Sequence, residues 1–127
     1  MTSTAEEMFD EAKARLRRLE ASHGIRILYA CEAGSRSWGF PSPNSDYDIR
    51  FIYVRPLKHY LKLTQPADTI TLEQDDIWDI SGWDLKKCLM LLKKGNVSIV
   101  QCLYSPIIYR NHPLFLSEIR KLLDYGA

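Results

Sequence analysis

The 127-residue sequence has no marked charge imbalance, few cysteines and no long apolar run. Its formal net charge is +1, so no global basic field favours nucleic acid, and any RNA or DNA contact has to come from a local patch. The three cysteines, Cys31, Cys88 and Cys102, form no Cys-x-x-Cys pair, and their number is odd. This argues against a disulfide framework or a zinc site, and we expect buried thiols in a reducing compartment.

No apolar stretch reaches the roughly 18 residues of a membrane span. The N-terminus is acidic and polar, where a signal peptide would be basic and then apolar. The sequence therefore predicts a cytoplasmic protein with no membrane partner. A hydrophobic content of 46% and a charged content of 26% are ordinary for a soluble globular protein. The length suits one domain, over residues 1–127, that is large enough for its own core.

Helical and strand-like patterns alternate along the chain. Ser3 or Thr4 is expected to cap a first helix that Gly24 ends. A capping box at 81–84 is expected to start another helix, which Gly95 ends. Further helices are expected within 57–65, 96–104 and 113–123, and strands over 25–31, 46–54, 69–72, 77–80 and 107–109. This order predicts an α/β fold, a small mixed β-sheet with helices packed on it.

The most informative segment joins a glycine–serine turn, Gly34-Ser35, to two carboxylates, Asp46 and Asp48, at the start of an apolar strand. Residues i and i+2 of a strand point to the same face, so the two carboxylates would lie side by side. Mg²⁺ is commonly held by one or two carboxylates and substrate phosphates. The turn could offer N–H groups and a hydroxyl to those phosphates. The segment therefore predicts metal-dependent chemistry on a nucleoside triphosphate.

Arg50 lies on the same face of this strand as the carboxylates. Two roles are open for it: an ion pair with one of the aspartates, or a place near the triphosphate. Arg36 follows the Gly-Ser pair, and its alternatives are a solvated side chain or a phosphate contact. A row of lysines, Lys86, Lys87, Lys93 and Lys94, lies on the polar side of a predicted helix. Such a row is either a solvated face or a guide for a polynucleotide acceptor.

The Gly34-Ser35 pair, the ten-residue spacer and the Asp46-x-Asp48 pair resemble the signature of the DNA polymerase beta-like nucleotidyltransferase superfamily. The segments 34–39, 45–54 and 79–85 are similar to one branch, the predicted nucleotidyltransferases that include the RNA-repair-pathway ligase-associated protein. The resemblance runs from about residue 25 to residue 109. It implies a polymerase-beta-like fold. Family members continue well beyond this length, which leaves truncation at the C-terminus open.

The resemblance also implies site residues. In that family the Gly-Ser turn holds the triphosphate, so Gly34, Ser35, Arg36 and Arg50 are the expected nucleotide-binding residues. Three carboxylates hold two divalent metals, Mg²⁺ with Mn²⁺ as the alternative, and the first two match Asp46 and Asp48. The third usually lies on a neighbouring strand, where Asp79 is the best match. Other carboxylates compete for that third place: Asp75, Asp76 and Asp84.

The expected activity is transfer of a nucleoside monophosphate from an NTP to a hydroxyl acceptor by a two-metal mechanism. The acceptor stays open among an RNA end, a protein side chain and a small molecule. Some small members of the superfamily act as antitoxins that modify a partner toxin, and this alternative is kept. A second hypothesis is a non-catalytic module that binds nucleotide or RNA.

Overall fold

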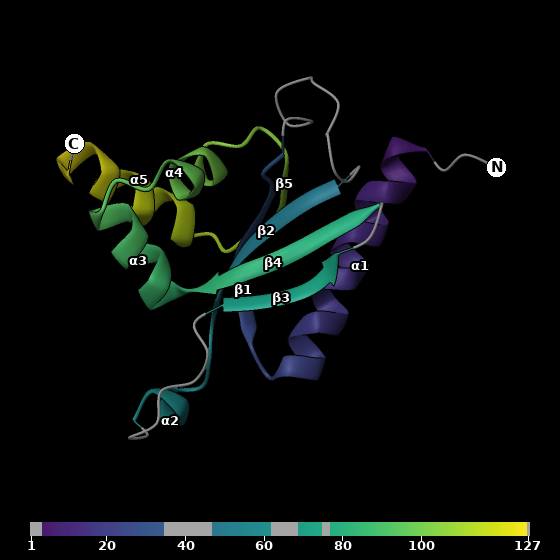
Figure 1. Ribbon diagram of the computed structural model, residues 1–127, viewed down its shortest axis with the longest axis horizontal. Helices are drawn as coiled ribbons and strands as arrows, with labels where there is room; N and C mark the ends of the chain where they lie inside the picture. Colours follow the sequence, from purple (N-terminus) through teal and green to yellow (C-terminus); the bar gives the residue numbers. More distant parts are fainter. Residues whose placement is uncertain (1–3, 35–46, 62–68, 75–76, 127) are drawn as a thin grey trace.

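The computed structural model describes residues 4–34, 47–61, 69–74 and 77–126. In these ranges the chain forms a mixed α+β fold in which a single sheet lies between helices (Figure 1). The helices are α1 (Ala5–His23), α2 (Leu57–Tyr60), α3 (Leu85–Lys93), α4 (Val97–Leu103) and α5 (Phe115–Gly126). The strands are β1 (Arg26–Glu32), β2 (Tyr47–Val54), β3 (Thr69–Gln74), β4 (Trp78–Asp84) and β5 (Ile108–Asn111).

The sheet has five strands in the order β3-β4-β2-β1-β5. β2 pairs with β4 in parallel, and the other three pairings, β1 with β2, β1 with β5 and β3 with β4, are antiparallel. The predicted small mixed sheet is therefore confirmed. Because β2 and β4 run parallel, both begin at the same end of the sheet, and the antiparallel β1 finishes there.

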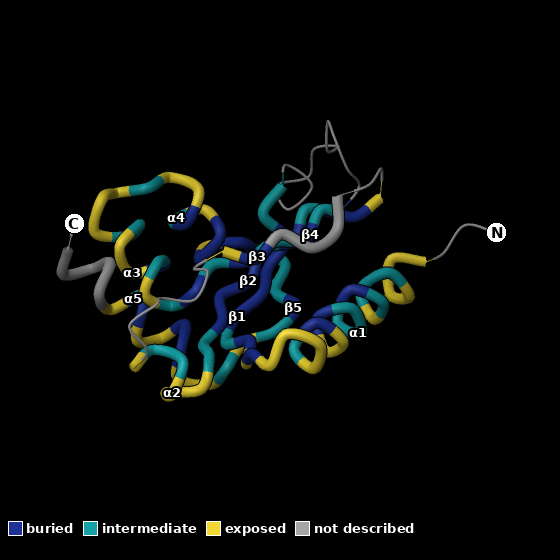
Figure 2. Tube along the Cα trace, turned by 60° about the horizontal axis from the view of Figure 1, so that its bottom comes forward, coloured by how far each residue is buried: buried dark blue, intermediate teal, exposed yellow. Residues whose placement is uncertain are grey.

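Each face of the sheet carries its own apolar cluster. One cluster packs α1 against the sheet, and the other packs α3, α4 and α5 against the opposite face (Figure 1). Alternation along β2 divides its side chains between them, since Tyr47, Ile49, Phe51 and Tyr53 join the α1 cluster while Ile52 joins the other. Figure 2 shows the central strands buried and α2 largely exposed. The site strands are therefore held between two packed layers.

The ends of α1 follow the sequence prediction. The Thr4 side chain accepts a hydrogen bond from the Glu7 N–H at 3.1 Å, and Gly24 ends the helix with φ 62°. The capping box at 81–84 was wrong, because β4 continues through Asp84, which alone caps α3 by accepting from the Lys86 N–H at 2.8 Å. These residues form a strand and not a capping box because residues 78–84 pair with β2 along their whole length. Gly82 lies under the Phe51 ring, where a Cβ atom would overlap the ring carbons.

The three cysteines are buried and unbridged, as predicted. Burial raises the pKa of the Cys88 thiol to about 12 and also raises the pKa of Cys31. Along the described stretches, none of the helices combines the length and apolar character needed to cross a membrane.

Candidate active site

The candidate site lies where β2 and β4 begin, at the right-hand end of both strands in Figure 1. Asp48 and Asp79 are direct neighbours in the parallel register of these strands. Both alternate with residues of the α1 cluster, Tyr47 and Ile49 on β2 and Trp78 and Ile80 on β4, so they share the opposite face. The parallel pairing thus places two carboxylates side by side from segments about thirty residues apart in the sequence.

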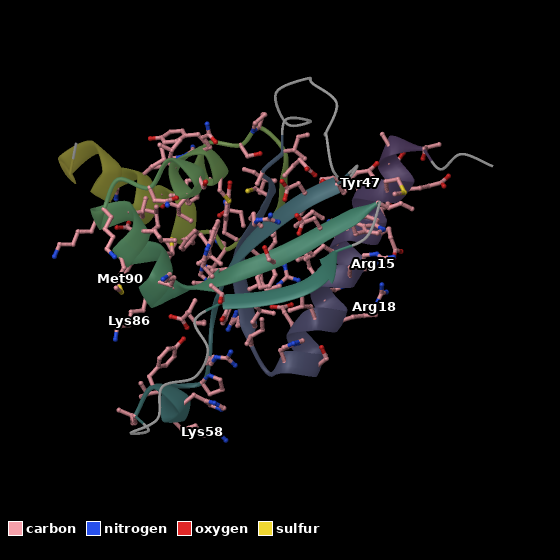
Figure 3. All side chains as sticks on the ribbon, viewed as in Figure 1. Arg15, Arg18, Tyr47, Lys58, Lys86 and Met90 are labelled. Carbon is pink, nitrogen blue, oxygen red and sulfur yellow. The ribbon has the colours of Figure 1, made fainter. Side chains whose placement is uncertain are left out.

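Beneath the carboxylates, the ring of Tyr47 stacks on Trp78 with centroids 4.8 Å apart. The guanidinium of Arg15 on α1 lies 4.5 Å from the Trp78 ring centroid. Figure 3 labels Tyr47 at this end of β2 and Arg15 on the neighbouring helix. This aromatic and cationic packing fixes the first residues of β2 and β4 from below, where a fraying strand end would otherwise loosen the site.

Arg50 lies between the two carboxylates. Its Nη1 is 2.6 Å from Asp48 Oδ1, and its Nη2 is 3.2 Å from Asp79 Oδ2. Nη1 also donates to the carbonyl oxygens of Ile49 at 3.0 Å and Asp79 at 3.3 Å. Arg50 therefore makes the ion pair that the sequence left open, and its place near the triphosphate stays a prediction.

The carboxylates keep unused hydrogen-bonding capacity. Oδ1 of Asp79 is buried and accepts no hydrogen bond from any described residue, and the contact of Asp48 Oδ1 with Arg50 is a charge pair without hydrogen-bond alignment. Burial raises the pKa of Asp48, the Asp79 charge raises it further, and Arg50 opposes both. Adjacent buried oxygens with too few donors suit a divalent cation, so this pair fits the metal that the sequence predicts.

The turn that leaves β1 lies against Asp48. A Cβ atom on Gly34 would be 2.9 Å from Asp48 Cβ and 3.5 Å from Glu32 Oε2. The Ala33 N–H donates to the Asp48 carbonyl at 2.7 Å, and the Asp48 N–H donates to Glu32 Oε2 at 2.7 Å. Glycine is therefore required by close approach, and the start of the predicted phosphate-binding turn touches the predicted metal ligand.

The structure places some of the predicted residues and not others. Gly34, Asp48, Arg50 and Asp79 are brought together. Several other predicted or competing residues lie outside the described ranges: Ser35, Arg36, Asp46, Asp75 and Asp76. Asp84 lies at the far end of β4, where it caps α3 and accepts a hydrogen bond from Tyr60. Within the ranges described, no three His, Cys, Asp or Glu side chains form a metal-binding group.

Sequence reasoning missed Glu32. This carboxylate is 0% exposed at the end of β1, and its Oε1 accepts from the Tyr109 hydroxyl at 2.8 Å. Its signal in the sequence was a charged residue closing an apolar strand two positions before Gly34. Acidic residues are almost never fully buried unless they are paired, so this position could have been singled out.

Comparison with known proteins gives a family match over nearly the whole chain. A model described as the RNA repair pathway DNA polymerase beta family (RlaP) matches residues 8–126. An uncharacterized protein of Bacillus subtilis (strain 168), YcgL, is 47% identical over 107 residues. The match covers 84% of this chain but only 41% of YcgL. No solved structure matches the chain.

Proposed function

Because the chain belongs to the RNA repair pathway DNA polymerase beta family, we propose that it is a metal-dependent nucleotidyltransferase. It transfers a nucleoside monophosphate from an NTP to a hydroxyl acceptor. The observation that supports this is the half-buried Asp48–Asp79 pair, in which Asp48 lies directly beside the Gly34 turn. Metal ligands and a phosphate-binding turn would have to be adjacent in such an enzyme, because the metal would neutralise charge on the phosphates that the turn holds.

In the proposed reaction the acceptor hydroxyl loses its proton to solvent and its oxygen forms a bond to the α-phosphorus. The bond from that phosphorus to the oxygen that bridges to the β-phosphorus breaks, and pyrophosphate leaves. Asp46, Asp48 and Asp79 would hold two divalent ions, Mg²⁺ or Mn²⁺, which supply Lewis-acid stabilisation of the attacking and leaving oxygens. Gly34 and Ser35 orient the triphosphate. Arg50, which neutralises both described carboxylates, also holds their side chains toward each other before substrate binds.

The acceptor belongs to this proposal as an RNA end, a protein side chain or a small molecule. The family description, an RNA repair pathway, favours RNA. On α3, Figure 3 shows Lys86 projecting away from the sheet, and Lys93 and Lys94 are exposed. The chain spans less than half the length of YcgL. Whether the part of YcgL that this chain does not match has a counterpart that binds the acceptor therefore belongs to the proposal.

The test is incubation with each α-labelled NTP, Mg²⁺ and a panel of RNA ends and proteins. We expect label to join one acceptor class, with release of pyrophosphate and with loss of both in Asp79→Asn. Label on a co-purifying protein would favour the antitoxin alternative. No transfer to any acceptor, including water, would contradict the enzyme proposal.

A second candidate is a non-catalytic nucleotide-binding module. It is favoured by Arg50, which already neutralises Asp48 and Asp79. This candidate predicts NTP binding that is unaffected by removal of Mg²⁺, whereas the enzyme proposal predicts binding that weakens when EDTA is added. Calorimetric titration with a non-hydrolysable NTP, with and without Mg²⁺, separates the two.

A further inference from the structure

We propose that Glu32 is a positioning residue that sets the backbone of Asp48 through the reach of its side chain, and that it does not itself bind metal. The inference rests on the proposed function only for its kinetic consequence. Its structural basis is a fully buried carboxylate with hydrogen bonds to two strands other than its own.

Both carboxylate oxygens of Glu32 accept from the protein. Oε2 accepts the Asp48 N–H from β2 at 2.7 Å, and Oε1 accepts the Tyr109 hydroxyl from β5 at 2.8 Å. The Glu32 carbonyl also accepts the Ser105 hydroxyl at 2.6 Å, which holds the main chain of this residue. Each carboxylate oxygen thus accepts from a donor on another strand, one a backbone N–H and one a hydroxyl, and a carboxylate bonded in this way holds those groups in place.

The contact with Asp48 is not part of the regular strand ladder. In the β1–β2 register Glu32 faces Ile49, and beyond that pair the ladder is continued by the Ala33 N–H to the Asp48 carbonyl. The Asp48 N–H is thus held by a side chain at the point where the two strands separate. The same Oε2 atom would lie 3.5 Å from a Cβ atom added to Gly34, so Glu32 also lies near the start of the predicted phosphate-binding turn.

Two variants distinguish the effect of the length of the Glu32 side chain from the effect of its charge. Glu32→Gln keeps the length of the side chain and loses the charge, whereas Glu32→Asp keeps the charge and shortens the side chain by one methylene group. If reach is what matters, Glu32→Gln should behave like the parent and Glu32→Asp should not. Tyr29→Phe is the matched control, because it removes one buried hydrogen bond from the same strand, to the Cys102 carbonyl at 2.8 Å, without touching Glu32.

The first readout is hydrogen exchange at the Asp48 amide, and the second is Mn²⁺ affinity by calorimetry. For Glu32→Asp we expect Asp48 exchange to quicken about tenfold, since the shorter side chain no longer reaches the Asp48 N–H and that hydrogen bond is lost. We expect Mn²⁺ affinity to fall about tenfold or more, as it does when groups that orient metal ligands are removed. Glu32→Gln and Tyr29→Phe should stay within about threefold of the parent for both.

Turnover gives the third readout. Glu32→Asp should lower kcat with little change in the KM for NTP, and Glu32→Gln should restore it. Loss in Glu32→Gln with retention in Glu32→Asp would mean that the charge acts directly, and it would overturn the positioning role. Equal behaviour of the two variants would overturn it as well. Exchange at Asp48 is measured without substrate, so this test stands even if the parent transfers no nucleotide.

Discussion

At the scale of single residues, Asp48 combines a proposed role as a metal ligand with a cost to the stability of the fold. Burial raises its pKa, so ionising this carboxyl group costs more free energy in the folded protein than in the unfolded chain. For a carboxyl group with a raised folded pKa, this penalty is present at neutral pH and is relieved as the pH falls through that pKa. Sites that hold metals often carry such penalties, which a bound cation offsets.

We predict that Asp48→Asn lowers transfer by at least about a hundredfold, because a metal ligand is worth several kcal/mol in the transition state. The same variant should unfold with a free energy equal to the parent's or higher by roughly 1 kcal/mol at pH 7. That difference in unfolding free energy should shrink as the pH is lowered toward the pKa of the folded Asp48 carboxyl group. Urea unfolding at several pH values measures it, with exposed Asp10→Asn as the control. If Asp48→Asn retains activity, the assignment of Asp48 as a metal ligand is wrong.

Gly34 is constrained by the closeness of Asp48. We predict that Gly34→Val weakens NTP binding strongly, because its side chain would displace Asp48 and block the approach of phosphate. Ser35→Ala should weaken binding less, by about the worth of one hydrogen bond, roughly 1 kcal/mol. Titration with a non-hydrolysable NTP and Mg²⁺ is the measurement, and Ser117→Ala on α5 is the matched control. If both site variants bind like the parent, the turn is not a phosphate cradle.

At the scale of elements, β4 carries two aspartates with different tasks at its two ends. Asp79 begins the strand beside Asp48, while Asp84 ends it, caps α3 and accepts the Tyr60 hydroxyl at 2.5 Å. The hydrogen bond to Asp84 and the burial of the hydroxyl both raise the pKa of Tyr60, burial being the larger cause. The length of β4 therefore keeps the candidate site residue Asp79 apart from Asp84, which stabilises the fold.

We predict opposite phenotypes for the two positions. Asp84→Ala should lower the free energy of unfolding by about 1–2 kcal/mol through loss of the cap, with kcat per folded molecule kept within a few-fold. Asp79→Asn should lower kcat far more than stability. Thermal unfolding and transfer assays on the same preparations make the comparison. Loss of catalysis in folded Asp84→Ala would reopen its claim to the third carboxylate position.

At the scale of the whole molecule, the cysteines report on the integrity of the apolar cluster between the sheet and the helices α3, α4 and α5, to which all three belong. All three are buried, and Cys88 and Cys31 have raised pKa values because of burial. We predict that they resist a thiol reagent at pH 8 in the native state and react together in denaturant, because thiolate is the nucleophile. Ellman titration during urea unfolding should follow the far-UV transition. A thiol that reacts well before that transition would reveal local opening of α3 or α4.

How far the sequence predicts this molecule depends on the range of the interactions involved. The cap at Thr4, the stop at Gly24 and the strand predicted over 46–54 depend on local patterns. The structure confirms the cap and the stop, and it describes the strand from Tyr47 to Val54. Residues 81–84 carry a local capping pattern that pairing with β2 overrides. The local sequence cannot show that the strand is favoured over the capping box, because the Phe51 ring that requires Gly82 comes from another strand.

The site divides in the same way. The Asp46-x-Asp48 pair could be predicted from the sequence because the alternation of a strand acts within three residues. Asp79 was selected by its resemblance to the family's third carboxylate. Glu32 was missed because its partners, Asp48 and Tyr109, lie 16 and 77 residues away in the sequence. A buried carboxylate is explained only by what surrounds it, and that environment exists only once the sheet has formed.

The pairing of the last strand with the first has a consequence for synthesis. β1, β2 and β4 leave the ribosome before β5, whose Tyr109 supplies a hydroxyl to Glu32 from 77 residues downstream. Until that residue has emerged, the Glu32 carboxylate has one of its described donors missing, and the edge of β1 is open. Contacts of such long range form late in folding. The nascent chain can therefore pair its site strands early but completes the support of Asp48 only after residue 109 has been added.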